Sequence, residues 1–114
     1  MKTDEFRCTA DYDSKFDLLS FKRPGMRSSG AIKAGPFTID FYKNELAGIE
    51  VEGASAMLRS LFGLKMDLSK IQKAKIGFKE EGRTFLLFFT IRHQEQDIRK
   101  EVLVPKVEPI PIMT

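Results

Sequence analysis

The sequence contains a single cysteine, Cys8, and a single histidine, His93. With one cysteine, no internal disulfide can form and no cysteine-rich metal site can be built, which is typical of a protein from a reducing compartment. The longest apolar run, at residues 85–89, is far shorter than the ~20 residues of a membrane-spanning helix. Residues 1–13 also lack the apolar core of a signal peptide. We therefore expect a cytoplasmic protein with no membrane partner.

The composition is that of a folded protein of modest size. The chain has 114 residues, of which 42% are hydrophobic and 31% charged, so it is too apolar to be disordered. We expect one domain at residues 1–105 and an extended, proline-containing tail at 106–114. The balance of 19 basic against 16 acidic residues gives a net charge of +3. Because both signs are mixed along most of the chain, the net charge alone does not indicate a nucleic-acid binder.

Alternating apolar and polar residues predict most of the secondary structure as strands. Two β-hairpins are expected, one from 5–11 and 16–22 and one from 37–42 and 46–51. Residues at helical spacing predict a short helix at 54–62, which Gly63 is suited to end. A three-strand meander follows, at 71–78, 83–92 and 97–105. The expected fold class is α+β: a largely antiparallel sheet of about six to seven strands, with the helix packed on one face.

The middle strand of the meander is apolar on both sides. Phe85, Leu87, Phe89 and Ile91 alternate with Leu86 and Phe88. A strand of this kind is covered on two faces, and one short helix can hardly cover both. We therefore expect these six residues to provide a self-association face, and the protein to be its own partner in a homodimer.

Residues 11–62 resemble the small proteins of domain-of-unknown-function family 2283. The resemblance rests on a short signature at the end of the second hairpin and the start of the helix, formed by Asp40, Gly48, Ile49, Glu50, Ala54 and Ser55. It implies a small mixed β fold with a helix after the fourth strand, and it implies self-association but no reaction. Some members of the family are regarded as antitoxin-like partners of small toxins.

A glycine-rich loop at 22–35 is the strongest candidate for a binding site. It carries four cations and no acid: Lys22, Arg23, Arg27 and Lys33. Flexible backbone amides and cations together suit phosphate, RNA or an acidic partner. The same composition is also typical of a solvated linker, and no aromatic residue is interleaved for base stacking.

The other candidate sites fail on spacing. His93 falls in a predicted turn at 93–96, without a partner to orient it. Asp11, Asp13 and Asp17 are close together but lack the remaining positions of a calcium loop, and Ala31 stands where a phosphate-binding P-loop requires lysine. Glu50 is interpreted as an outward-facing strand residue and Ser55 as a helix-capping hydroxyl. We expect no catalytic residue, no metal site and no cofactor.

These observations leave three hypotheses for function. The first is a homo-oligomeric protein-interaction module, antitoxin-like or regulatory, whose partner is itself or an unidentified protein. The alternative is nucleic-acid or phosphate binding through the loop at 22–35. The third is an enzyme whose carboxylates are assembled only by folding, although the sequence itself favours a protein that is not an enzyme.

Overall fold

The computed structural model describes residues 5–63, 67–71, 73–93 and 95–105. The tail predicted at 106–114 lies outside this range. The described elements, in chain order, are β1 (Glu5–Asp13), β2 (Leu18–Lys22), β3 (Gly30–Ala34), β4 (Phe37–Tyr42), β5 (Glu45–Glu52), α1 (Ala54–Phe62), the 3-10 turn η1 (Leu68–Lys70), β6 (Ala74–Glu81), β7 (Thr84–His93) and β8 (Gln96–Pro105). The predicted α+β class with an antiparallel sheet is confirmed.

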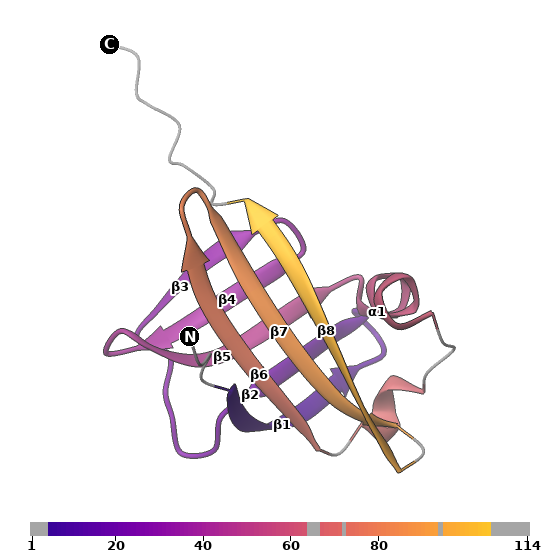
Figure 1. Cartoon of the computed structure of the whole chain (residues 1–114). Helices are drawn as coiled ribbons and strands as arrows, with labels where there is room; N and C mark the ends of the chain where they lie inside the picture. The colour runs from indigo at the N-terminus through magenta and orange to yellow at the C-terminus, as the bar shows by residue number, and fades with distance from the viewer. Residues whose placement is uncertain (1–4, 64–66, 72, 94, 106–114) are drawn as a thin grey trace.

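The strands form one antiparallel sheet that folds over on itself as a half-barrel. Its eight described strands follow the order β3-β4-β5-β2-β1-β6-β7-β8. β1 belongs to both halves: its first part, up to Cys8, pairs with β6, and its second part, from Thr9, pairs with β2. β6, β7 and β8 consequently lie across the strands β2 to β5 (Figure 1). Each half therefore has an inner face against the other half and an outer face.

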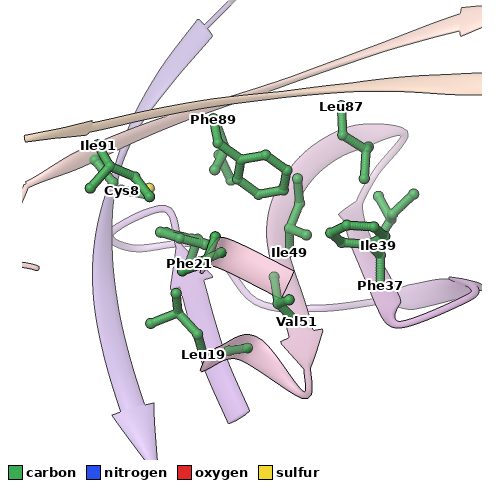
Figure 2. Close-up of a cluster of buried hydrophobic side chains, with 14 of the residues drawn as sticks. Cys8, Leu19, Phe21, Phe37, Ile39, Ile49, Val51, Leu87, Phe89 and Ile91 are labelled. Atoms are coloured by element: carbon green, nitrogen blue, oxygen red, sulfur yellow. The ribbon is translucent and has the colours of Figure 1, made fainter. Parts of the chain in front are cut away.

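The core fills the space between the two halves. Phe89 of β7 contacts both Phe21 of β2 and Phe37 of β4, with ring centroids 5.5 Å and 5.9 Å apart. These three rings, with Ile49 and Leu87 beside them, are almost completely buried (Figure 2). Burial of each large apolar side chain contributes about 1.5–3 kcal/mol. Contacts between the two halves therefore hold the sheet in its folded shape.

The helix lies where the sequence predicts it. α1 starts after Gly53 and ends at Gly63, and both glycines adopt the left-handed conformation. Its apolar side buries Ala54, Leu58 and Phe62 in the core. A helix of nine residues is not stable alone in water. Its stability therefore comes from this packing.

The strand count corrects the sequence-based prediction of six to seven. The additional strand is β3, which falls inside the loop predicted at 22–35 and pairs with β4. Ile32 lies opposite Ile39, and Ala34 is buried opposite Phe37. The glycines and prolines around β3 make this segment look like a loop in the sequence. As an edge strand, β3 pairs on one side only, so it needs little alternation of apolar and polar residues. The loop itself therefore shortens to residues 23–29.

Gly48 is expected to tolerate no side chain. A Cβ atom at this position would lie 2.6 Å from the backbone oxygen of Phe21 on the neighbouring strand. We predict that Gly48→Ala lowers the free energy of unfolding by about 1–3 kcal/mol, as forced overpacking usually does. Urea denaturation measures the change. Gly30→Ala is the control, since a Cβ there meets nothing within 4 Å. Equal midpoints for the two variants would contradict the prediction.

Candidate functional site

The sheet register gathers basic residues on the outer face of β1, β6 and β7. Arg7 lies directly opposite Lys75, and Lys75 lies opposite Thr90. One step further along, the backbone N–H of Arg92 donates to the oxygen of Lys73 at 3.3 Å. The residues between them in the sequence, such as Ile91 and Ala74, are buried in the core. Since side chains alternate along a strand, the basic side chains point outwards.

These side chains surround a hollow of about 460 Å³. The residues that line it, called here the basic hollow, are Arg7, Cys8, Thr9, Lys73, Ala74, Lys75, Thr90, Arg92 and Asp97. Thr9 and Thr90 are short, whereas their basic neighbours are long, so a depression forms between them. The volume lies within the range typical of ligand pockets, about 300–1,000 Å³.

The hydroxyl of Thr90 is the most unusual polar group of the basic hollow. Its oxygen is buried and has no hydrogen-bond partner within the described residues. A buried hydroxyl without a partner costs about 1–3 kcal/mol. Thr90 itself is one of the residues that line the basic hollow.

The positive charge of the basic hollow is poorly compensated. Asp97 lies 3.7 Å from Arg92, measured from Oδ1 to Nη1, and both side chains are more than half exposed. Arg7, Lys73 and Lys75 form no salt bridge with a carboxylate in the part of the chain that the structure describes. Like charges directly opposite each other on neighbouring strands destabilise a sheet. This arrangement therefore costs free energy unless an anion binds.

Cys8 does not add reactivity to the basic hollow. Burial raises the pKa of its thiol to about 12. The thiol is consequently neutral at physiological pH, and it neither compensates the positive charge nor acts as a nucleophile.

The adjacent part of the same face is neutralised. Arg99 of β8 reaches over the ring of Phe88, with its guanidinium carbon 4.7 Å from the ring centre. Its Nε lies 2.7 Å from Glu5 and its Nη1 3.0 Å from Glu101. The hydrogen bond to Glu5 raises the pKa of Arg99. This cluster covers Phe88, which is only 3% exposed, and it borders the basic hollow.

The predicted self-association face is largely occupied within the monomer. Four of its six residues lie in the core: Phe85, Leu87, Phe89 and Ile91. Of the other two, Phe88 is covered by Arg99 and Leu86 is half-buried. Within the monomer, the folded-over sheet covers one side of β7 and a charged side chain covers the ring of Phe88 on the other. Self-association through this face stays a prediction.

The four cations of the predicted anion-binding loop lie in different environments in the structure. Those four residues are Lys22, Arg23, Arg27 and Lys33. Arg23 donates to the oxygen of Leu46 at 2.9 Å and stacks on Phe6, 3.8 Å from the ring centre. Lys33 lies on β3 and pairs with Glu52 at 2.7 Å. Arg27 is exposed, and Lys22 is exposed on the outer face of β2. Two of the four are therefore engaged in contacts within the fold.

The residues of the family signature separate into two groups. Ile49 and Ala54 are buried in the core. Asp40, Gly48 and Glu50 line a smaller pocket of about 190 Å³ beside Lys22. The Oδ1 atom of Asp40 accepts a hydrogen bond from the hydroxyl of Ser28 at 3.2 Å.

Ser55 does not cap the helix, contrary to the sequence-based interpretation. It donates through its backbone N–H and its hydroxyl to the carboxylate of Asp17, at 3.0 Å and 2.7 Å. Asp17 lies in the β1–β2 turn with a left-handed φ of 50°, and it also accepts from the hydroxyl of Tyr12 at 2.7 Å. The hydrogen bonds from Ser55, and then from Tyr12, lower the pKa of Asp17. The turn therefore caps α1 from a distance in sequence.

The remaining candidate residues form no site among the described residues. No group of three or more histidine, cysteine or acidic side chains suited to a metal ion occurs there. Asp13 accepts hydrogen bonds from the turn amides of Lys15 and Phe16. The backbone of His93 ends β7, and its side chain lies outside the description. No described helix is long and apolar enough to cross a membrane.

Comparison with protein-family models, curated proteins and solved structures finds no match to this chain. The resemblance to domain-of-unknown-function family 2283 therefore stays a prediction.

Removal of the Asp17 carboxylate should loosen the start of α1. We predict that Asp17→Ala lowers the free energy of unfolding by about 1–2 kcal/mol, the usual cost of losing a helix cap. Because the pKa of Asp17 is lowered from 3.8 in the folded state, its stabilisation is present above that pH and is lost as the pH falls through the folded pKa. Urea titrations at pH 7 and at pH 3 measure both effects.

The matched control is Asp11→Ala, because Asp11 is exposed on the adjoining part of β1. If Asp17→Ala has the same urea midpoint as the wild type at pH 7, the carboxylate has no stabilising role. If the difference in stability between the variant and the wild type grows as the pH falls, the predicted direction of the pH dependence is wrong.

Proposed function

We propose that this protein is a binding module that holds a phosphate-bearing ligand in the basic hollow. The observation that carries the proposal is the pairing of Arg7 with Lys75, and of Lys73 with Arg92, around the unpartnered hydroxyl of Thr90. Opposite charges facing each other at these positions would make the sheet more stable than like charges do. A bound anion offsets the repulsion between the cations.

Phosphate suits the basic hollow better than a smaller anion. It carries about two negative charges and three acceptor oxygens. Arginine can donate two parallel hydrogen bonds to such a group, while lysine supplies a compact point charge. Among the described residues, Asp97 is the only carboxylate that lines the basic hollow, and it faces Arg92. The composition of the lining therefore favours binding over acid–base catalysis.

Two alanine variants test this proposal against inorganic tripolyphosphate, measured by calorimetry at low salt. We expect Arg7→Ala and Lys75→Ala each to weaken binding about 10-fold or more, because hydrogen bonds to charged groups contribute about 1.5–3 kcal/mol. In the ligand-free protein the same variants should be as stable as the wild type, or more stable by up to ~1 kcal/mol, since repulsion is relieved.

Lys100→Ala is the control, because it removes the same charge from the opposite face of β8, where Lys100 lies across from the core residue Phe89. Failure of the wild type to bind tripolyphosphate, or equal binding by all three variants, would exclude the basic hollow as a phosphate site.

Self-association is a second candidate function, now through the exposed edge of β8. Leu103 is 59% exposed, and it lies opposite the half-buried Leu86 on the outer face. β8 has a described neighbour on one side only, which is the arrangement that strand addition by a second copy requires. The homodimer expected from the sequence thus stays a proposal, with a different contact surface.

Ultracentrifugation tests the dimer directly. We expect the wild type to form a dimer at tens of micromolar and Leu103→Asp to be a monomer, because a carboxylate would be buried against its symmetry mate. Lys100→Asp is the matched control for a new acid on β8. A wild-type monomer throughout this range would rule out the dimer.

A further inference from the structure

The positive surface continues from the basic hollow onto a fourth strand. Thr9, which lines the basic hollow, lies opposite Lys22 of β2, and its hydroxyl donates to the oxygen of Lys22 at 3.3 Å. Lys22 therefore projects from the same outer face, directly across β1. It is exposed, and no salt bridge to it occurs among the described side chains. One of the cations singled out in the sequence thus lies beside the basic hollow, although it lines the smaller pocket.

The cations form a track that crosses four neighbouring strands. We call it the cationic track, and it consists of Lys22 on β2, Arg7 on β1, Lys73 and Lys75 before and within β6, and Arg92 on β7. The order β2-β1-β6-β7 contains three strand spacings, so the track is about 14 Å long. This length exceeds what one phosphate group occupies.

Acidic residues bound the cationic track at both ends. Beyond Lys22, Asp40 and Glu50 line the small pocket beside it. Beyond Arg92, Asp97 lies opposite on β8. A positive strip with negative borders focuses the field along its length and guides a chain of anions in one direction. A compact anion would need only the basic hollow, and Lys22 would then serve no purpose in binding.

We propose that the ligand is the phosphate backbone of a single nucleic-acid strand, which runs across β7, β6, β1 and β2 along the cationic track. This inference rests on the proposed function and specifies its ligand. With phosphates about 3.4 Å apart along a helical strand, and further apart in an extended one, 14 Å accommodates roughly two to four of them. The lining contains no aromatic side chain among the described residues. The bases therefore find no stacking platform, and binding is independent of sequence.

Lys22→Ala separates a chain from a compact ligand. The probes are a fluorescent ten-nucleotide oligothymidylate, followed by anisotropy at several salt concentrations, and inorganic tripolyphosphate, followed by calorimetry. For the wild type and the oligonucleotide we expect a log–log salt slope of about −1.4 to −2.8, at roughly 0.7 for each of two to four neutralised phosphates of a single strand. Lys22→Ala should weaken oligonucleotide binding about 3- to 10-fold and reduce the slope by about 0.7, while tripolyphosphate binds as before.

Lys75→Ala and Lys100→Ala complete the set. Lys75→Ala should weaken both probes, whereas Lys100→Ala should affect neither. Suppose that Lys22→Ala leaves the oligonucleotide affinity and the salt slope unchanged, while Lys75→Ala lowers the affinity for tripolyphosphate. The cationic track is then refuted and the phosphate site stands. The same conclusion follows if the wild type binds tripolyphosphate but not the oligonucleotide. If Lys75→Ala alters neither probe, the proposed function itself fails.

Discussion

The contact of Phe89 with Phe21 and Phe37 is the interaction on which the rest of the structure depends. It joins one half of the sheet to the other, and a flat sheet of these strands would expose all three rings to water. Because the rings are buried only when the sheet folds over, β1 has to turn from β6 to β2 between Cys8 and Thr9. The same turn places Arg7 and Thr9 on the outer face beside Lys75 and Lys22. The core and the cationic track therefore have one geometric origin.

The outer face contains two arrangements of charge that differ in their energetics. Around Phe88, Arg99 is held by Glu5 and Glu101, and an exposed network of this kind contributes little stability beyond shielding the ring. Two residues further along β1 and β6 from Glu5 and Gly77, Arg7 and Lys75 oppose each other without a described counter-ion. A folded chain with acids available at neighbouring positions could neutralise this pair as well. Arg99 lies in the same row of the register as Arg7 and Lys75, yet only Arg99 is paired with acids. This contrast is the strongest argument that an external anion belongs in the basic hollow.

The sequence predicts local structure well and the site poorly, for physical reasons. Alternation identifies β7, and helical spacing with Gly63 identifies α1, because both signals are contained in a few consecutive residues. β3 escapes detection because its single neighbour, β4, imposes little pattern on it. Arg7, Lys75 and Arg92 each look like an ordinary exposed strand residue, and only the register of three strands makes them neighbours. The sequence also does not reveal that Asp17 caps the helix by accepting hydrogen bonds from Ser55, since the turn and the helix are far apart in the chain.

The division of β1 between two partners also determines the order in which the chain can fold during synthesis. Its second half can pair with β2 as soon as that strand emerges, since only a short turn separates them. Its first half has to wait for β6, which begins at Ala74, and contacts of such long sequence separation form slowly. During this interval Glu5 to Cys8 form an open strand edge in the nascent protein. Glu5 and Arg7 place charges on that edge, and charged side chains are a common protection of unpaired edges against aggregation. The residues that shape the outer face of the mature protein thus also serve the growing chain before its partner strand exists.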